Sequence, residues 1–374
     1  MSRIVIIASV SLSLINFRES LIDELVSRGH EVIAVAPKDN DTDTVRQKLL
    51  EKGVHLEVYP LSSTSLSILK NYHSYCALRL ILKKNKPNIV IAYTAKPIIC
   101  AGLALKKFTK IKFYPLITGL GYGFIESKSL KRKFIRYFMI LLYRRALKLS
   151  SGVIFQNPDD KALFHKLRLI PINVSTYIIN GSGVDLKLYP YSNLPKKKIF
   201  LMLARLLVDK GVREYSEAAR FVRLRFPNVI FRLAGKFDKN PSSISPIELQ
   251  SWINEGHIEY LGDVSPVQPI LTDCRFYVLP SYREGTPRSV LEALATGRPI
   301  ITTDVPGCRE TVIHGKNGLL IPAKNAQDLA TAMIKLLEEK EEVIQKMARA
   351  SYDLARNKYD VIKVNRSILN IFGL

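Results

Sequence analysis

The chain has little cysteine and no arrangement of cysteine or histidine that would hold a metal. Its four cysteines, Cys76, Cys100, Cys274 and Cys308, are scattered and form no Cys-x-x-Cys pair. This argues against a zinc site or a disulfide framework and fits a protein of the reducing cytoplasm. The six histidines show no ligand spacing either. We therefore expect no metal and no cofactor.

Long apolar runs are also missing. No stretch approaches the roughly 20 apolar residues that a membrane-spanning helix requires. The apolar run at residues 4–10 is short and lacks a small-residue cleavage pattern, so a buried first strand explains it better than a signal peptide. At 374 residues the chain is long enough for two domains.

Acidic residues are scarce relative to basic ones. The chain has 56 Lys and Arg against 33 Asp and Glu, a formal net charge of +23, and a pI near 9.8. Nucleic acid, an anionic membrane and anionic small molecules would each complement this charge. The sequence contains no recognised groove-reading module or aromatic RNA platform, so we expect no nucleic-acid partner.

One basic segment, residues 128–148, contains no acid at all. Aromatic and aliphatic residues such as Phe134, Tyr137 and Phe138 alternate with its cations. Such a mixture on a helix suits the surface of an anionic membrane. The alternative is a helix with a buried apolar face and a solvated basic one. The cations are Lys128, Lys131, Arg132, Lys133, Arg136, Arg144, Arg145 and Lys148.

Short apolar runs alternate with helical patterns along the whole chain, which is typical of parallel sheets covered by helices on both faces. The pattern pauses near residues 182–197 and then restarts, indicating two doubly wound α/β domains. We expect strands at residues 4–10, 31–36, 54–59, 89–92, 112–118, 199–204, 229–234, 258–261, 275–280 and 299–302. We expect helices at residues 16–28, 42–52, 69–85, 212–226, 325–338 and within 341–374.

The most informative stretch is residues 281–299. It turns through Glu284-Gly285-Thr286-Pro287 and continues as a helix that stops at Gly297. Proline suits the first helical position and glycine the position after the last. The helix N-terminus would then face the strand tips and offer a site for an anion such as a diphosphate. Glu284 and Glu292 would accept hydrogen bonds from ligand hydroxyls, unless they are simply two solvated glutamates of an amphipathic helix.

Seven residues separate Glu284 from Glu292. This arrangement resembles the signature of the retaining glycosyltransferases of family 4, which have the GT-B fold. Gly-Thr-Pro after the first glutamate and Gly-Arg-Pro after the second strengthen the resemblance. It implies that Glu284 contacts the donor sugar and Glu292 the ribose, with Gly285, Thr286 and Pro287 beside them in the donor site. It also implies two Rossmann-like domains that face a cleft, with a C-terminal helix that packs back on the first domain.

Arg205 and Lys210 follow the first strand of the second domain. Two cations there would complement a diphosphate leaving group, whose charge grows as the glycosidic bond breaks. The segment resembles the family's Gly-Arg-Leu…Lys-Gly element, with Ala204 in place of the usual glycine. We expect Arg205, Lys210 and Glu284 to be catalytic, unless the two cations merely lie on the surface.

A second loop, Leu261-Gly262-Asp263-Val264, follows a later strand of the same domain. It resembles the family's base-binding loop, in which backbone groups read the uracil edge. This resemblance places Gly262 and Val264 in the donor site, and an ordinary turn is the alternative.

Three segments of the first domain resemble the branch of family 4 that extends polyprenyl-diphosphate-linked saccharides. They are Asn16-Phe17-Arg18, Tyr93-Thr94-Ala95-Lys96-Pro97, and the glycine-rich turn at residues 118–123, which is not the dinucleotide fingerprint because its third glycine is misplaced. In that branch such loops line the acceptor side, and Arg18 and Lys96 would hold the acceptor diphosphate. The implied acceptor-binding residues are Asn16, Arg18, Lys96, Gly119 and Gly121.

The resemblance predicts a retaining, nucleotide-sugar-dependent hexosyltransferase. It would move an N-acetylhexosamine, with N-acetylgalactosamine favoured, from a UDP-sugar to a polyprenyl-diphosphate-linked saccharide in bacterial surface polysaccharide or glycan assembly. We expect residues 1–185 to bind the acceptor, residues 186–350 to bind the donor, and residues 351–374 to form the returning helix. The protein would lie on the inner face of the cytoplasmic membrane. A nucleic-acid-binding protein, a sugar-nucleotide epimerase and a non-catalytic binding relative are the alternatives.

Overall fold

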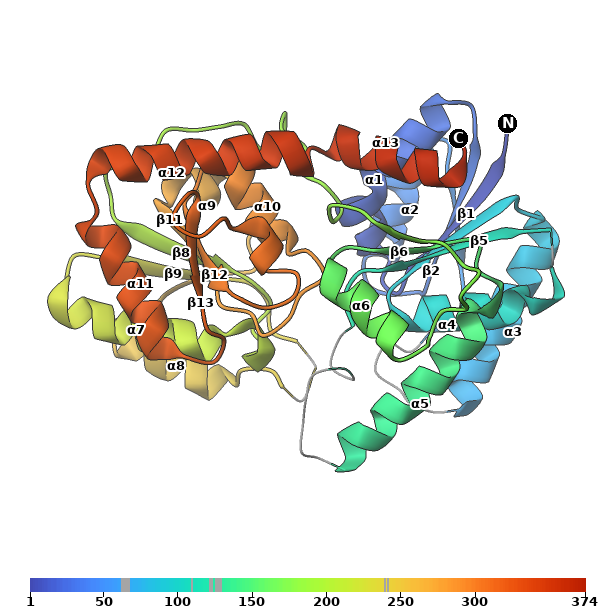
Figure 1. Cartoon of the computed structure of the whole chain (residues 1–374), viewed down its shortest axis with the longest axis horizontal. Coiled ribbons are helices and arrows are strands. Elements are labelled where there is room, and N and C mark those ends of the chain that lie inside the picture. The colour runs from blue at the N-terminus through green and yellow to red at the C-terminus, as the bar shows by residue number, and fades with distance from the viewer. Residues whose placement is uncertain (62–67, 109, 121–123, 125–129, 239, 241) are drawn as a thin grey trace. The chain divides into compact units, whose positions relative to one another are not determined.

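Two parallel sheets organise the chain (Figure 1). The computed structural model describes residues 1–61, 68–108, 110–120, 124, 130–238, 240 and 242–374. Residues 1–179 and 365–374 form one unit, and residues 180–364 form the other. The predicted α/β class with two doubly wound domains is confirmed.

The first unit has a seven-stranded sheet in the order β3-β2-β1-β4-β5-β6-β7. Its central strands are buried apolar runs, as expected of strands that are covered on both faces. The strands are β1 (Arg3–Ile7), β2 (Glu31–Ala36), β3 (His55–Val58), β4 (Ile89–Tyr93), β5 (Lys112–Ile117), β6 (Val153–Phe155) and β7 (Thr176–Ile178).

The helices of the first unit cover both faces of this sheet. Because crossovers between parallel strands are right-handed, the helices that lead outward from β1 in opposite directions lie on opposite faces. Helices α1 and α2 therefore cover one face, and α3, α4 and α5 cover the other. The helices are α1 (Leu12–Ser27), α2 (Thr42–Glu51), α3 (Ile68–Asn85), α4 (Ala95–Ala104), α5 (Leu130–Ala146) and α6 (Pro158–Lys166).

The second unit has a six-stranded sheet in the order β10-β9-β8-β11-β12-β13. The strands are β8 (Ile199–Leu203), β9 (Ile230–Ala234), β10 (Glu259–Gly262), β11 (Phe276–Leu279), β12 (Ile300–Thr303) and β13 (Gly318–Ile321). The helices are α7 (Val212–Arg225), α8 (Pro246–Asn254), α9 (Gln268–Asp273), α10 (Arg288–Ala295), α11 (Ala326–Glu338) and α12 (Glu341–Leu354).

The strand order of each sheet reverses at one point. The reversal lies between β1 and β4 in the first unit and between β8 and β11 in the second. Ligands of open α/β sheets bind beyond the carboxyl ends of the strands at such a point. We therefore expect a ligand to contact the loops that follow these four strands.

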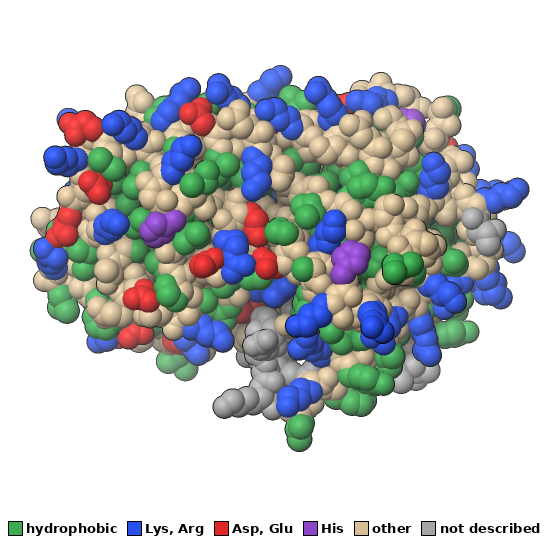
Figure 2. All heavy atoms as spheres, viewed as in Figure 1, with side chains coloured by type: hydrophobic (Ala, Val, Ile, Leu, Met, Phe, Trp, Pro, Cys, Tyr) green, Lys and Arg blue, Asp and Glu red, His purple; other side chains and the backbone are tan. Residues whose placement is uncertain are grey.

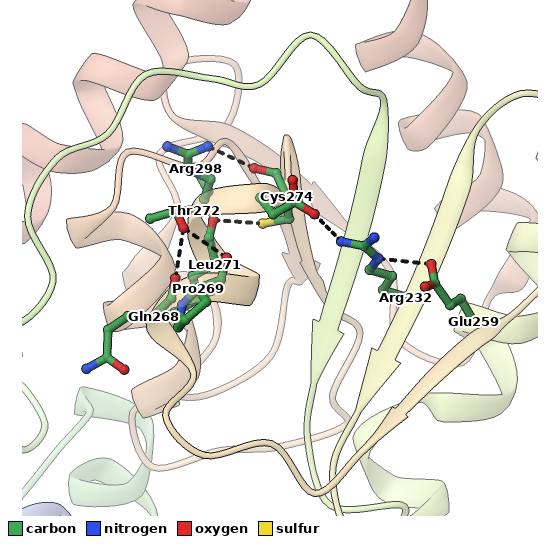
Figure 3. Close-up of polar contacts among 9 residues, drawn as sticks. Arg232, Glu259, Gln268, Pro269, Leu271, Thr272, Cys274 and Arg298 are labelled. Atoms are coloured by element: carbon green, nitrogen blue, oxygen red, sulfur yellow. Dashed lines mark hydrogen bonds and ion pairs between the residues drawn. The ribbon is translucent and has the colours of Figure 1, made fainter.

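Polar contacts, some of them buried, hold the framework of the second unit (Figure 3). Arg298, which is fully buried, donates to the backbone oxygen of Cys274 at 2.8 Å and to Ser192 Oγ at 2.6 Å. Arg232 on β9 pairs with Glu259 on β10 at 2.9 Å. Arg298 belongs to the Gly-Arg-Pro of the sequence signature, so this part of the signature anchors the connecting segment rather than a ligand.

The C-terminal segment passes from the second unit to the first. Helix α12 packs on α10, and a π-helical turn, Ala355–Tyr359, then leads into α13 (Val361–Phe372). In the first unit, Asn365 Nδ2 donates to Ser20 Oγ at 3.0 Å, and the Phe372 ring lies 4.7 Å from that of Tyr114. The predicted return of a C-terminal helix to the first domain is confirmed.

The units change at residues 179/180 and 364/365, whereas the sequence suggested boundaries at 185/186 and 350/351. The second boundary differs because α12 still packs against α10 of the second unit. Within the described residues, no helix is both long and apolar enough to cross a membrane.

Gly211 allows the turn after β8 to approach the end of β11. Its φ is +76°, and a Cβ at this position would lie 2.2 Å from the backbone oxygen of Pro280. Gly256 has a similar φ of +74°, but a Cβ there would meet only Arg223 Nη1 at 3.9 Å. The two glycines share a backbone conformation and differ in the space around them.

We expect Gly211→Ala to destabilise the second unit more than Gly256→Ala. Both variants place alanine in the left-handed region, at about 1 kcal/mol, but only the first forces backbone atoms apart, at about a further 1–3 kcal/mol. Urea unfolding followed by the fluorescence of Trp252, the single tryptophan, measures the difference. Equal midpoints for the two variants would contradict the close approach.

Candidate functional site

The carboxyl edge of the second sheet gathers the residues that the sequence assigned to the donor. Arg205 and Lys210 follow β8, and Glu284 follows β11, its neighbour at the point where the strand order reverses. The backbone holds the two loops together, since the amide of Tyr282 donates to the oxygen of Asp209 at 2.9 Å. The topology thus places both predicted elements at one edge of one sheet.

Lys210 and Glu284 form an ion pair between Lys210 Nζ and Glu284 Oε1. The side chains are only 18% and 13% exposed, and Ser281 Oγ donates to the same carboxylate oxygen at 2.6 Å. A largely buried charge that loses its partner costs about 3–5 kcal/mol, so each group requires the other or a ligand of equivalent charge. Glu284 is not a solvated glutamate, and the structure rejects that alternative.

The loop that carries Glu284 is fixed from the opposite side by Gly307. The amide of Glu284 donates to the backbone oxygen of Pro306 at 3.0 Å. A Cβ on Gly307, whose φ is +84°, would lie 2.3 Å from the Glu284 oxygen and 2.6 Å from the Gly285 oxygen. Gly307 was not predicted from the sequence, although a Pro-Gly turn after a strand was a signal for it.

Helix α10 begins directly after this loop. Pro287 occupies its N-cap position with φ −72° and ψ 112°, and its side chain makes no capping hydrogen bond. Gly285 and Thr286 precede it in the loop. The N-terminal end of the helix carries partial positive charge, which suits an anion near Glu284 and Lys210.

Glu292 lies in the second turn of α10 and is 7% exposed. Its Oε1 accepts hydrogen bonds from Tyr189 Oη at 3.0 Å and from Arg288 Nε at 2.8 Å. Burial and the neighbouring Glu292 carboxylate raise the pKa of Tyr189 well above its ordinary value. Glu292 is therefore held in place by two protein groups, neither of which the sequence analysis had identified.

Arg205 is more open than Lys210. Its side chain is 55% exposed, and its Nη1 lies 2.6 Å from Asp238 Oδ2. The backbone beneath it is fixed, because Leu206 donates to Lys236 and Ile244 donates to Leu206. Both predicted phosphate-binding cations are thus paired with carboxylates, Lys210 with Glu284 and Arg205 with Asp238.

Gly262 and Val264 lie at the end of β10 and in the turn that follows it, beside the turns after β8 and β9. Gly262, with φ +76°, ends β10, and its oxygen accepts from the amide of Gly235 at 2.8 Å. A Cβ on Gly235 would lie 1.8 Å from the Ala204 oxygen, so the turns after β8, β9 and β10 touch through backbone atoms. Val264 is half-buried. The structure brings the predicted base-binding loop next to the predicted phosphate-binding loop.

The first unit places a buried cation near the carboxyl ends of β1 and β4. Arg18 on α1 is 3% exposed, and its guanidinium carbon lies 4.9 Å from the centre of the Tyr93 ring. Tyr93 in turn shares a 2.8 Å hydrogen bond with Ser13 Oγ. Burial raises the pKa of Tyr93 to about 12, although the Arg18 charge opposes the rise.

Thr94 and Lys96 form the turn between β4 and α4. Thr94 has φ +66° and ψ 157°, a strained conformation for a β-branched residue. Its buried Oγ1 has no hydrogen-bond partner among the described residues. Lys96 is half-buried in the first turn of α4, and burial lowers the pKa of its ammonium group. Strain and desolvation of this kind concentrate at functional sites.

The remaining predicted acceptor residues fall around this turn or beyond the described part of the chain. Asn16 is exposed on α1, two residues before the buried Arg18. Gly119 follows β5 with φ +119°. Gly121 lies outside the described residues. The segments that follow the three neighbouring strands β1, β4 and β5 thus carry Asn16, Arg18, Lys96 and Gly119.

Within the part of the chain that the structure describes, the cysteines and potential metal ligands do not form a second reactive site. Among the residues that the structure covers, no group of three or more His, Cys, Asp or Glu side chains could hold a metal. Cys308 is fully buried, and burial, aided by the Glu284 charge, raises the pKa of its thiol to about 12. Cys308 is therefore not a thiolate nucleophile.

The sequence is similar to known glycosyltransferases along almost its whole length. Residues 19–181 match the family described as Glycosyltransferase Family 4, and residues 197–339 match the one described as glycosyl transferases group 1. The chain is 32% identical to the N,N'-diacetylbacillosaminyl-diphospho-undecaprenol alpha-1,3-N-acetylgalactosaminyltransferase of Campylobacter jejuni, over 96% of each protein. It is 26% identical to an Escherichia coli UDP-Gal:alpha-D-GlcNAc-diphosphoundecaprenol alpha-1,3-galactosyltransferase, over 84% of this chain and 82% of that protein.

The fold is also shared with solved glycosyltransferase structures. Anabaena HepE in complex with UDP-glucose superposes with a TM-score of 0.78 at 17% identity, over the full length of both chains. At this level of identity the likeness shows the fold alone. It confirms the predicted GT-B architecture.

We expect Arg205→Ala to weaken the binding of UDP about tenfold or more, and Arg213→Ala to change it less than twofold. A charge-assisted hydrogen bond to phosphate is worth about 1.5–3 kcal/mol. Arg213 is a matched control, since it is 53% exposed and lies 2.6 Å from Glu248, as Arg205 is 55% exposed and lies 2.6 Å from Asp238. Titration calorimetry measures both variants, and equal affinities would remove Arg205 from the donor site.

Proposed function

We propose a specific transfer reaction for this chain, which belongs to glycosyltransferase family 4 and is a nucleotide-sugar-dependent hexosyltransferase. The reaction moves an N-acetylhexosamine, with N-acetylgalactosamine favoured, from a UDP-sugar to a polyprenyl-diphosphate-linked saccharide. The name of the Campylobacter relative, a transferase of this sugar onto a diphospho-undecaprenol saccharide, supports this choice. The product would enter the assembly of bacterial surface polysaccharide or glycan.

The observation that carries the proposal is the Lys210–Glu284 pair at the N-terminal end of α10. A glycosyl diphosphate combines an anionic group with a ring of hydroxyls, and this edge offers matching groups side by side. Lys210, Arg205 and the helix end would bind the diphosphate, and the Glu284 carboxylate would accept hydrogen bonds from the sugar. The donor diphosphate would take the place of Glu284 as the partner of the Lys210 charge.

The proposed chemistry retains the anomeric configuration. The bond between the anomeric carbon and the diphosphate oxygen breaks, and the acceptor hydroxyl bonds to the same face of that carbon. The hydroxyl proton passes to the departing diphosphate, so no protein base is needed. Arg205 and Lys210 would stabilise the negative charge that develops on UDP, and Glu284 would stabilise the positive charge on the sugar. This assignment requires no metal ion.

The acceptor would bind at the carboxyl edge of the first sheet. Arg18 and Lys96 supply cationic groups near the strained turn at Thr94, and Asn16 and Gly119 lie at the same edge. These residues would hold the acceptor diphosphate and the saccharide attached to it. Desolvated cations bind phosphate strongly because water competes less for their charge.

A polyprenyl-linked acceptor would require the enzyme to work at a membrane surface. The first half of α5 suits such contact, since Leu130, Phe134 and Tyr137 are 81%, 71% and 62% exposed. Only its C-terminal part, with Tyr143 and Ala146, is buried. The exposed aromatic and aliphatic side chains at the start of α5 support the membrane interpretation over a helix that keeps its apolar residues on a buried face. We place the enzyme on the inner face of the cytoplasmic membrane, bound to anionic lipid rather than to nucleic acid.

Screening UDP-sugars with a short polyprenyl-diphosphate-linked saccharide tests the reaction. We expect acceptor-dependent release of UDP, fastest with UDP-N-acetylgalactosamine and unchanged by EDTA, and an α-linked product by NMR. Release of UDP without acceptor, or conversion of the sugar nucleotide itself, would instead indicate a hydrolase or an epimerase. Loss of turnover in EDTA would overturn the proposal that no metal takes part.

We expect Lys210→Ala and Glu284→Ala each to lower turnover about 30-fold or more, because each loses at least about 2 kcal/mol of transition-state stabilisation. Each single variant also removes the Lys210–Glu284 ion pair and leaves one of its two largely buried charges in place, whereas the double variant removes both charges. The double variant should therefore recover stability but not activity. Glu248→Ala, in the exposed pair with Arg213, is the control. Turnover near that of the control in either single variant would remove that residue from the mechanism.

A further inference from the structure

The positive charge of the chain is concentrated in one stretch of the first unit. Between Glu57 and Asp159 the sequence has eighteen Lys and Arg and a single acid, Glu126. This stretch carries +17 of the net charge of +23, and the rest of the chain has 38 basic and 32 acidic residues. The imbalance extends well beyond α5, so α5 alone does not account for it.

The helices of this stretch cover one face of the first sheet. Helix α4 lies between α3 and α5 and contacts both. Seven of its ten residues are buried. A Cβ on Gly102 of α4 would lie 2.3 Å from the backbone oxygen of Ala146 on α5, which shows how closely these helices pack. The outward surface on this side is consequently provided largely by α3 and α5.

Helix α3 exposes apolar side chains next to cations. Tyr72 and Leu80 are 60% and 68% exposed, and they share a helical face with Lys83, which is also exposed. Lys106 and Lys107, which follow α4, are exposed as well. Tyr72 and Leu80 lie on the outward side of α3, where an amphipathic surface helix usually carries polar residues.

We propose that the outward side of α3, defined by Tyr72, Leu80 and Lys83, is a second contact with the anionic lipid surface. This second contact would add to the membrane contact proposed above for α5, and the inference rests on that proposed function. Two helices on the same face of one sheet would dock the first unit in a defined orientation, whereas α5 alone would act as a single anchor.

The chemistry of this face favours lipid as its binding partner. Exposed aromatic and aliphatic side chains enter the headgroup region of a bilayer, while lysines beside them attract anionic headgroups. On the side shown in Figure 2, basic and hydrophobic side chains mix over the α5 region. An acidic protein partner would match the charge as well, and the dependence of binding on phosphatidylglycerol, measured below, distinguishes it from lipid.

The test compares the α3 surface with a matched one on the other face of the same sheet. The variant is Tyr72→Ser/Leu80→Ser/Lys83→Gln in the full chain. The control is Lys48→Gln/Leu50→Ser on α2, where Lys48 is exposed and Leu50 is 58% exposed. Co-sedimentation uses vesicles of phosphatidylcholine with and without phosphatidylglycerol. We expect about tenfold weaker binding of the α3 variant to the anionic vesicles, and wild-type binding of the control.

Three outcomes would overturn the inference. They are wild-type binding by the α3 variant, an equal loss in the control, and binding that does not depend on phosphatidylglycerol. Transfer to a short, water-soluble acceptor is measured in parallel and should be the same in the α3 variant and the wild type. Absence of that transfer in the wild type would defeat the proposed reaction, while the vesicle comparison would still decide the role of α3.

Discussion

A lysine and a glutamate held side by side with little water around them are the constraint on which the second unit depends. Lys210 and Glu284 come from turns after two neighbouring strands, and neither charge is stable in a buried setting without the other. Gly211 and Gly307 make the pairing possible, because any larger residue would separate the backbones that carry the two side chains. In the proposed function, the donor diphosphate would replace the carboxylate as the partner of Lys210, and the structural pair would become a binding site.

The family signature combines two kinds of residue. Glu284 and the loop that follows it lie at the carboxyl edge, where ligands bind. Arg298, near the end of the same signature, is fully buried and holds the connecting segment through Ser192. Glu292 shares features of both, since its side chain is buried and its carboxylate accepts hydrogen bonds from Tyr189 and Arg288. A contiguous motif therefore combines residues of the candidate site with residues that hold the fold.

The fold was predictable from the sequence because its signals are local. Apolar runs and helical periods located the central strands and most helices, and Pro287 and Gly297 marked the two ends of α10. Strands β6, β7 and β13 were not predicted, and β6 and β7 have only three residues, too few to show a period. The sequence also left two interpretations of the 128–148 segment open, and the exposed side chains of Leu130 and Phe134 support the membrane interpretation that we propose.

The sequence by itself determined which chemical groups the site would contain, since Arg205, Lys210, Glu284 and Glu292 sit in recognisable motifs. Only the tertiary structure decided their partners. Asp238 lies 33 residues from Arg205, and Tyr189 lies 103 residues from Glu292. Such pairs form because strand order brings distant loops to one edge, and strand order follows from the packing of the whole sheet. Local sequence patterns report the conformation of a segment and carry no record of its distant neighbours.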